Sequence, residues 1–369
     1  MKQVRVAVAM SGGIDSSMSA VLLREAGHEV IGIHAIMHSY AHTPLSKSGL
    51  ISAQAIADRY SFRLLEISAE KEFNEKIVLP FCQTYCEGKT PNPCVHCNHL
   101  IKAGLLLDEA RRYGCDALAT GHYARISRTD EGRFFVARGQ EYDKDQSYFL
   151  YMLTQEQLRF LILPLSGYRK EDVRRMAVER GISVAARSES QDVCFIPDGR
   201  YVDFIERMVS RIPPPGDIED ANGNVVGRHR GIHRYTIGQR RGIGIASPHP
   251  LYVKTIDPLR NTITVGKREE LNRCGLLAED IRYMKATSLD GLSVLLKTRA
   301  TQHPFRAHLK ETSSGVSAFF DEPQTSITPG QAAVFYNEQM EVLGGGTISR
   351  AIPCGEIDPR MEDAGGNVL

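Results

Sequence analysis

Two groups of residues in this chain have the types and spacing needed for chemistry: a glycine–serine loop near the N-terminus and a set of cysteines further along. The loop has the sequence Ser11-Gly-Gly-Ile-Asp-Ser-Ser17 and directly follows an apolar run. Paired glycines let the backbone approach a phosphate group closely, and hydroxyls and amides at a helix N-terminus donate hydrogen bonds to it. No Gly-Lys-Ser/Thr follows, so this is not a Walker loop. The pattern predicts a phosphate site between a strand and a helix rather than a plain serine-capped turn.

Three of the cysteines have surroundings that suit a reactive thiol. Cys94 and Cys97 lie in the run GKTPNPCVHCN, and Cys194 lies in SQDVCF. Cys97 is expected at the start of a helix through residue 113, where the helix N-terminus lowers a thiol pKa, and Arg187 would favour a thiolate at Cys194. Because the thiolate is the nucleophilic form, these residues predict nucleophilic sulfur chemistry. The alternatives are a zinc half-site, which usually wants a second CxxC or paired histidines, and two inert thiols. The other cysteines are expected to be small buried hydrophobic residues: Cys82, Cys86, Cys115, Cys274 and Cys354.

Composition limits the class of protein. The 369 residues carry 45 Lys and Arg against 44 Asp and Glu, and 42% of them are hydrophobic. This balance excludes a chain dominated by disorder, and no apolar run approaches the roughly 20 residues that span a bilayer. Eight cysteines without an export signal predict a reducing, cytoplasmic environment, where thiols are more often catalytic or metal-binding than paired. We therefore expect a cytoplasmic globular protein with no membrane partner.

The elements that must position these residues follow from the hydrophobic pattern. Apolar runs at 4–10, 29–36, 62–67 and 115–119 alternate with helical patterns at 16–26, 52–60, 71–86 and 98–113. This alternation predicts an N-terminal α/β domain with a doubly wound parallel sheet, which binds ligands at the carboxyl ends of its strands. After the prolines at 213–215, short alternating runs predict two smaller, mainly β domains with a break near 272–279. The expected domains are 1–205, 206–275 and 276–369.

The loop resembles the PP-loop of ATP pyrophosphatases, which split ATP into AMP and pyrophosphate to adenylate a carbonyl oxygen. Similar loops serve amidotransferases, argininosuccinate synthesis, tRNA lysidine formation and tRNA thiolation, so the loop alone does not choose a substrate. Across essentially the whole chain, however, eight motifs are similar, in order, to those of tRNA-specific 2-thiouridylases. They are SGGIDSS (11–17), GKTPNPCVHCN (88–98), ATGHYAR (119–125), KDQSYFL (144–150), ESQDVCFI (189–196), GIHRYTIGQRRGIGI (231–245), PLYVKTIDPLRNTITVG (250–266) and TPGQAAVFY (328–336). The resemblance implies a PP-loop domain followed by two β domains, the last a β-barrel.

The resemblance also implies a reaction, in which ATP adenylates O2 of the wobble uridine of a tRNA and sulfur then replaces that oxygen. Cys194 would carry a terminal persulfide sulfur, and Cys97 would be the second catalytic thiol. Either the persulfide attacks C2 directly, or Cys97 first releases hydrosulfide from it. Both routes leave a Cys97–Cys194 disulfide that must be reduced before the next turnover. The implied cofactors are ATP and Mg²⁺, and the implied partners are a tRNA with a wobble uridine and a protein persulfide donor, either a sulfur relay or a cysteine desulfurase.

Further site residues are carried over from the matching motifs. Those implied to contact ATP are Ala9, Met10, Ser11, Gly12, Gly13, Ile14, Asp15, Ser16, Ala35 and Gly121. Those implied to contact the target base or the tRNA are Thr90, Pro91, Asn92, Lys144, Asp145, Gln146, Arg299 and Ala300. His122 is either a base or a structural histidine that holds its loop.

A basic run in the first β domain adds a prediction from charge alone. No acidic residue lies between Asp220 and Asp257, a segment that contains several arginines. Such a run produces a local positive field in a neutral protein, which is typical of a surface that follows phosphates. We therefore predict tRNA contacts at Arg240 and Arg241, and Tyr235 either stacks on a base or packs in a core.

This sequence departs from the commonest family pattern at two functional places. Cys94 stands where many members have an aspartate, a proposed acid/base. Cys94, Cys97 and Cys194 thus offer three corners for a four-iron cluster, as in some related tRNA thiolases, as an alternative to the persulfide scheme. The adenine-contacting methionine of the family aligns with Ala35, or with Met37 if a gap is allowed.

Two rival functions remain at this stage. An AMP-forming amidotransferase or ligase would share the loop but have no need of thiols. A metal- or redox-sensing RNA-binding protein would bind RNA without releasing pyrophosphate. Neither explains the ordered motifs as well as a thiouridylase does.

Overall fold

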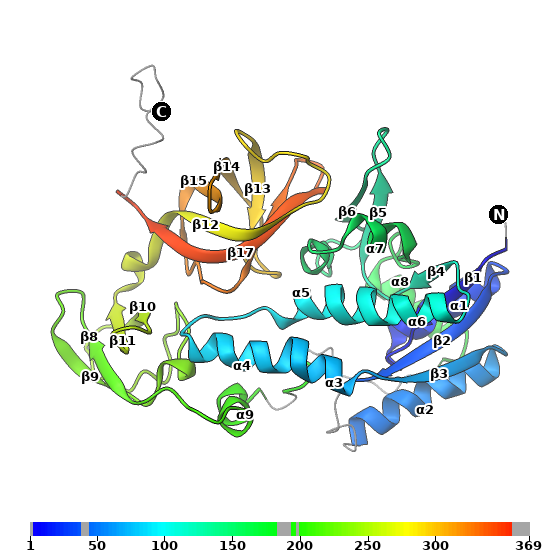
Figure 1. The fold of residues 1–369 in the computed structure, drawn as a ribbon, viewed down its shortest axis with the longest axis horizontal. Coiled ribbons are helices and arrows are strands. Elements are labelled where there is room, and N and C mark those ends of the chain that lie inside the picture. Colours follow the sequence, from blue (N-terminus) through cyan, green and yellow to red (C-terminus); the bar gives the residue numbers. More distant parts are fainter. Residues whose placement is uncertain (1–2, 38–43, 183–192, 197–198, 356–369) are drawn as a thin grey trace.

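The computed structural model describes residues 3–37, 44–182, 193–196 and 199–355 (Figure 1), and for residues 44–47 it describes the backbone alone. The N-terminal part is built on a parallel sheet in the order β3-β2-β1-β4-β7, which confirms the predicted α/β class. Strand β1 lies at its centre, and its Val6, Ala7 and Val8 are fully buried because helices cover both faces. The strands are β1 (Arg5–Ala9), β2 (Glu29–Ile36), β3 (Arg63–Ser68), β4 (Ala117–Ala119) and β7 (Leu161–Ile162).

The helices of this domain include two long runs interrupted by π-helical turns, a feature that often marks functional sites. The first comprises α3 (Glu70–Phe73), η2 (Asn74–Val78) and α4 (Leu79–Cys86), and the second α5 (Pro93–Cys97), η3 (Asn98–Leu105) and α6 (Leu106–Arg112). The second run therefore begins at Pro93, not at the predicted position of Cys97, because proline is well placed in a first turn. The other helices are α1 (Ile14–Glu25), α2 (Pro44–Arg59), η4 (Ser147–Leu150), α7 (Gln155–Phe160), α8 (Lys170–Glu179) and α9 (Tyr201–Met208).

A hairpin and a small sheet connect this domain to the rest of the chain. The hairpin of β5 (Ala124–Arg128) and β6 (Phe134–Arg138) reaches the C-terminal part, where the amide of Arg138 donates to Met340 O at 3.0 Å. The small sheet has the order β10-β11-β8-β9, and Tyr235 lies buried in its core, as one of the two predictions for that residue states. Its elements are β8 (Gly216–Glu219), β9 (Val225–His229), η5 (Ile232–Arg234), β10 (Tyr252–Asp257) and β11 (Thr262–Gly266).

The C-terminal part is a closed antiparallel barrel in the order β12-β15-β14-β13-β16-β17, as the family resemblance implies. Alternating apolar residues fill its interior, and Leu276, Leu296 and Phe335 are fully buried there. The expected break near 272–279 lies within the first barrel strand, which follows η6 (Arg268–Leu271) directly. The strands are β12 (Asn272–Tyr283), β13 (Ser293–Lys297), β14 (Phe305–Thr312), β15 (Gly315–Thr325), β16 (Ala332–Tyr336) and β17 (Val342–Pro353).

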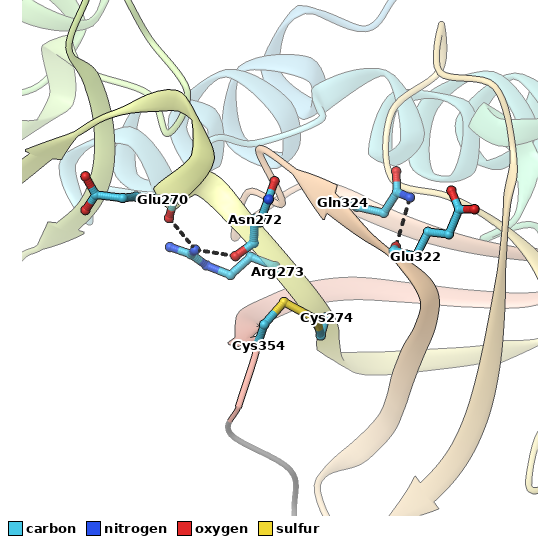
Figure 2. Close-up of a disulfide and its surroundings, with 7 residues drawn as sticks. All are labelled: Glu270, Asn272, Arg273, Cys274, Glu322, Gln324 and Cys354. Atoms are coloured by element: carbon cyan, nitrogen blue, oxygen red, sulfur yellow. Dashed lines mark hydrogen bonds between the residues drawn. A yellow bond between two sulfur atoms is a disulfide. The ribbon is translucent and has the colours of Figure 1, made fainter. Parts of the chain in front are cut away.

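A disulfide between Cys274 and Cys354 joins β12 to the end of β17 (Figure 2). This corrects the expectation that both residues are merely buried hydrophobic thiols. The antiparallel register pairs the residues beside them, Arg273 with Pro353, so the two side chains meet although they lie 80 residues apart. Nothing in the local sequence around either cysteine indicates this pairing.

None of the helices that the structure describes has both the length and the apolar character needed to cross a membrane.

Candidate active site

The glycine–serine loop follows β1 and opens α1, as the sequence predicts. Its hydroxyls bind the loop itself: Ser16 Oγ donates to Gly13 O at 3.0 Å and lies 3.2 Å from Ser11 Oγ. Gly12 has a φ of +76°, and a Cβ there would lie 2.0 Å from Gly49 O on α2, so only glycine fits. The loop is thus a tight turn beneath α2, with the N-terminal end of α1 available to an anion.

The neighbours of the loop that are implied to contact ATP lie in strands and adjacent turns. Met10 is buried; its amide donates to Ile33 O at 2.8 Å, and its carbonyl oxygen lies 2.8 Å from His34 Nδ1. Ala9 and Ile14 are partly buried in the two cores that flank the sheet. Ala35 and Met37 both pack against the cluster that contains Cys97, so each remains a candidate for the adenine contact.

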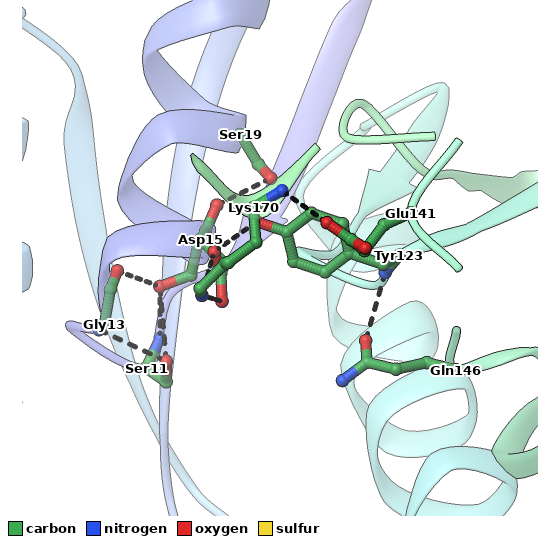
Figure 3. Close-up of polar contacts among 9 residues, drawn as sticks. Ser11, Gly13, Asp15, Ser19, Tyr123, Glu141, Gln146 and Lys170 are labelled. Atoms are coloured by element: carbon green, nitrogen blue, oxygen red, sulfur yellow. Dashed lines mark hydrogen bonds and ion pairs between the residues drawn. The ribbon is translucent and has the colours of Figure 1, made fainter. Parts of the chain in front are cut away.

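Asp15, in the first turn of α1, has a set of partners that the sequence analysis missed (Figure 3). Lys170 Nζ donates to both of its carboxylate oxygens, at 2.7 and 2.6 Å, and the Tyr123 hydroxyl donates to Oδ1 at 2.7 Å. The Tyr123 amide in turn donates to Gln146 Oε1 at 3.0 Å. Lys170 lies 155 residues from Asp15 in a helix that reads as an ordinary charged one, so only the fold reveals the pair.

Gly121 lies against the same turn. A Cβ at this position would be 2.9 Å from the carbonyl carbon of Asp15, so the segment that carries ATGHYAR packs directly on the loop. His122 beside it contacts Thr120 Oγ1 through Nδ1 at 2.7 Å, and burial lowers its pKa to about 3. The ring is therefore neutral near pH 7 and very weakly basic, which supports the structural role for this histidine over the role of a base.

The three thiols singled out from the sequence are free, and they lie at the start of the second long helical run and in the turn at 193–196. Cys94 is in the first turn of α5, Cys97 is buried at its last residue, and the side chains of Cys94 and Cys194 reach solvent. Desolvation by the surrounding protein raises the pKa of all three, that of Cys97 to about 11. The expectation of lowered thiol pKa values is therefore wrong, because burial outweighs the helix N-terminus; Arg187 lies outside the described residues.

One lysine acts on all three thiols. The charge of Lys102, on η3, opposes the effect of burial on the pKa of Cys94, Cys97 and Cys194, and it also lowers the pKa of His122. The charge of one ammonium group thus affects both the thiols and the segment that packs on the phosphate loop. Lys102 follows Cys97 by five residues, the spacing that a π-helix aligns.

The three thiols act on one another, since both Cys94 and Cys194 contribute to the raised pKa of Cys97. Among the described residues, no three or more His, Cys, Asp or Glu side chains are grouped so as to hold a metal ion. Cys97 and Cys194 are both free thiols, close enough that Cys194 contributes to the raised pKa of Cys97. The disulfide implied between them is therefore not formed in this state.

The loop that precedes α5 carries the residues implied to flank the target base, and both β domains hold it. The Thr90 amide donates to Pro329 O at 2.9 Å, and its hydroxyl donates to Thr236 Oγ1 at 3.4 Å. Gln331 Nε2 donates to the carbonyls of Thr90 and Pro91, at 3.1 and 3.2 Å. Gln331 was not singled out from the sequence, although it lies in the motif TPGQAAVFY.

The other residues implied to contact tRNA gather around this loop. Asn92 hydrogen-bonds the Tyr148 hydroxyl, and the charge of Arg299 acts on that same hydroxyl. Asp145 lies near Lys297, whose pKa its charge raises against the larger lowering effect of burial. The segment 144–148, the end of β13 and the loop that precedes α5 therefore lie close to one another.

The remaining residues predicted to contact tRNA lie in different surroundings. Ala300 packs on the main core, and Lys144 is exposed. Arg240 and Arg241 are exposed in a stretch whose Gly238 touches Ser326, and Ser326 O accepts a hydrogen bond from Arg299 at 3.2 Å.

Comparisons with known proteins agree with this geometry. Three family models match in order: a tRNA methyl transferase HUP domain over 4–198, a tRNA methyl transferase PRC-barrel domain over 202–267 and an aminomethyltransferase β-barrel domain over 273–348. The chain is 44% identical over 362 residues to the tRNA-specific 2-thiouridylase MnmA of Geobacter metallireducens, covering 95% of this chain and 98% of the relative. It is 43% identical over 353 residues to that of Chloroflexus aurantiacus, covering 94% and 98%.

A solved 4-thiouridine synthetase–RNA complex with bound ATP is 15% identical, covers 56% of this chain and 50% of its own, and has a TM-score of 0.36, too low to support an argument. The identity to the curated relatives extends over nearly the whole of both chains. On this ground, the chain belongs to the tRNA-specific 2-thiouridylase family.

Proposed function

We propose that this protein uses ATP to replace O2 of the wobble uridine of tRNA by sulfur. The observation that carries the proposal is that the segment 119–125 packs directly on the phosphate loop, where a Cβ at Gly121 would lie 2.9 Å from the carbonyl carbon of Asp15. The charge of Lys102 acts both on His122 in that segment and on Cys97, which relates the loop to the thiols. Oxygen is a poor leaving group from uracil C2, so a reaction at this carbon needs both an activating nucleotide and a sulfur nucleophile. The similarity to 2-thiouridylases over nearly the full length supports this pairing.

In the first step, the loop binds the phosphates of ATP through the amides at the start of α1. Uracil O2 attacks the α-phosphorus, pyrophosphate leaves, and O2 becomes part of an AMP ester that is a good leaving group. Mg²⁺ would be supplied with the nucleotide, and its chemistry would be to neutralise the charge of the phosphates during the transfer. Ser11 and the glycines beside it supply the close backbone approach.

In the second step, a terminal persulfide sulfur on Cys194 replaces AMP at C2. In one route this sulfur attacks C2, AMP leaves, and Cys97 then attacks Cys194 Sγ, which releases 2-thiouridine. In the other route Cys97 first attacks Sγ and releases hydrosulfide, which attacks C2. Both routes form a Cys97–Cys194 disulfide, and an external dithiol must supply two electrons to reduce it.

The exposures of the two thiols suit these roles. Cys194 reaches solvent, where a persulfide donor protein can transfer sulfur to it, whereas Cys97 is buried next to it. Lys102 stabilises the anionic forms of both. The expected partners in the cytoplasm are a tRNA with a wobble uridine and a sulfur relay protein or cysteine desulfurase.

The test is a thiolation assay with wobble-uridine tRNA, ATP and a persulfide donor, in which 2-thiouridine is detected by mass spectrometry. Cys97→Ser and Cys194→Ser should abolish 2-thiouridine while pyrophosphate release from ATP persists. Cys86→Ser, at a free thiol on α4, is the control and should keep full activity. Thiolation by either of the first two variants contradicts the proposal, and an active Cys94→Ala variant further excludes a cluster mechanism.

A further inference from the structure

We propose that Lys170 is a positioning residue of the phosphate loop: it holds Asp15 and cancels its charge, so that the loop at the start of α1 can bind a polyphosphate. The proposal rests on the proposed function, because ATP is the polyphosphate. It assigns a role to a residue of α8, which lies outside every motif that the sequence analysis related to nucleotide binding.

The contacts of Lys170 are those of a built site rather than of a chance surface pair. The side chain of Lys170 is 11% exposed and that of Asp15 is 31% exposed, and both carboxylate oxygens accept hydrogen bonds from the one ammonium. The ammonium also lies 5.4 Å from the centre of the Tyr123 ring, whose hydroxyl is the third donor to Asp15. Side chains from α8 and from Tyr123, the residue before β5, thus converge on the carboxylate of Asp15 on α1 (Figure 3).

The placement of Lys170 within its own helix also needs an explanation. It is the first residue of α8, where the helix dipole disfavours a positive charge. Glu141 offsets part of this cost, since its Oε2 accepts the Lys170 amide at 2.9 Å, and Asp15 pairs with the ammonium itself. The ion pair with Asp15 explains why a mostly buried lysine lies at this end of the helix.

The electrostatic effect on the loop follows from where Asp15 lies. Its carboxylate is in the first turn of α1, the turn whose free amides attract an anion. An unpaired carboxylate there would repel phosphates, and partial burial strengthens that repulsion because water screens it less. Lys170 makes the pair neutral overall, so the attraction of the helix N-terminus remains available to the ligand.

The chain itself supplies a matched control. Arg180 at the other end of α8 pairs with Glu25 at the other end of α1, with nitrogen–oxygen distances of 2.9 Å for both bonds. This second ion pair joins the same two helices far along them from the loop. If α8 acted only by packing on α1, removing either pair would have the same effect on the loop.

The experiment measures binding of Mg²⁺–ATP to the full chain by isothermal titration calorimetry. Lys170→Met should weaken ATP binding by at least about tenfold, as expected when one member of a partly buried charge pair is removed. Lys170→Arg should bind nearly as the wild type does. In the double variant, Asp15→Asn should restore much of the affinity that Lys170→Met loses, because it removes the unpaired carboxylate.

The control variant, Glu25→Gln with Arg180→Met, should leave ATP affinity unchanged. The inference is overturned if Lys170→Met binds ATP like the wild type, if Asp15→Asn fails to restore its binding, or if the control variant weakens binding equally. Should Lys170→Met not fold, the double variant and Lys170→Arg decide the question. Failure of the wild type to bind ATP is a separate result, which refutes the proposed function itself.

Discussion

At the free thiols of the site, burial and a nearby cation act in opposite directions on the pKa. Burial raises the pKa of Cys97 to about 11, and the charge of Lys102 lowers it by a smaller amount. A raised pKa means that the folded protein keeps the thiol protonated at pH values where an exposed cysteine has ionised. The Cys97 side chain is thus mostly the protonated thiol near neutral pH, and only a small fraction of it is the reactive thiolate.

This balance predicts how the thiol responds to pH and to loss of the cation. The rate at which iodoacetamide alkylates Cys97 should rise steadily from pH 8 toward 11, because only the thiolate reacts. Lys102→Met should slow it at every pH in that range, since removing the cation raises the pKa further. Peptide mass spectrometry separates Cys97 from Cys94, and Lys76→Met, on η2, is the control that should change nothing. A plateau near pH 8 would contradict the raised pKa.

The residue scale also marks the limit of what the sequence could predict. The loop, Cys97 and Cys194 were recognisable because each lies in a short contiguous motif. Lys170 and Gln331 were not, because each meets its partner only after the chain has folded over a separation of 155 or 241 residues. The direction of the thiol pKa shifts was wrong for the same reason, since burial is a property of the whole fold.

At the scale of elements, the hydrophobic periodicity predicted whether a segment is a helix or a strand better than it predicted the residues at which the segment begins and ends. β2 has the predicted bounds, 29–36, and Gly27 closes the turn that precedes it. The helices around the thiols contain π-turns at η2 and η3, which the search for a 3.6-residue hydrophobic period does not distinguish from α-helix. The first strand of the barrel was taken for a break because it begins immediately after η6.

The contact between the phosphate loop and α2 predicts a difference between two glycines. Gly12→Ala would place a Cβ 2.0 Å from Gly49 O, whereas Gly27→Ala has the same left-handed backbone but nothing within 4 Å. Denaturant unfolding should show a loss of about 1–2 kcal/mol for Gly27→Ala, the cost of the backbone conformation alone. Gly12→Ala should lose more and also lose ATP binding. Equal losses would mean that α2 does not constrain the loop.

At the scale of the whole molecule, the positive segment of the central sheet and the barrel residues near Arg299 adjoin the same loop. Arg240 and Arg241 are exposed, and their stretch touches Ser326 beside Arg299. A tRNA that places its wobble base at the target loop would thus extend its backbone across both β domains. Neutral net charge is compatible with such a surface because the positive charges are clustered.

The tRNA surface is tested by the salt dependence of binding. Replacing Arg240 and Arg241 by alanine should weaken tRNA binding and reduce the slope of log K against log salt by up to about two units. The matched control replaces Arg111 and Arg112, adjacent arginines on α6 that pair with Glu156 and Glu109. An unchanged slope in the first variant would show that these arginines do not contact phosphates.

The hydrogen bond from the Thr90 amide to Pro329 O joins the N-terminal domain to the barrel, so exchange of that amide proton reports separation of the two domains. An amide proton held by a bond between two domains exchanges with deuterium only when those domains separate, so its exchange rate reports the frequency of that event. Gln331 adds two further hydrogen bonds between the barrel and this loop, to the carbonyls of Thr90 and Pro91. The exchange rate of the Thr90 amide proton, measured in deuterated buffer with and without tRNA, therefore reports how often the barrel separates from the loop that precedes α5.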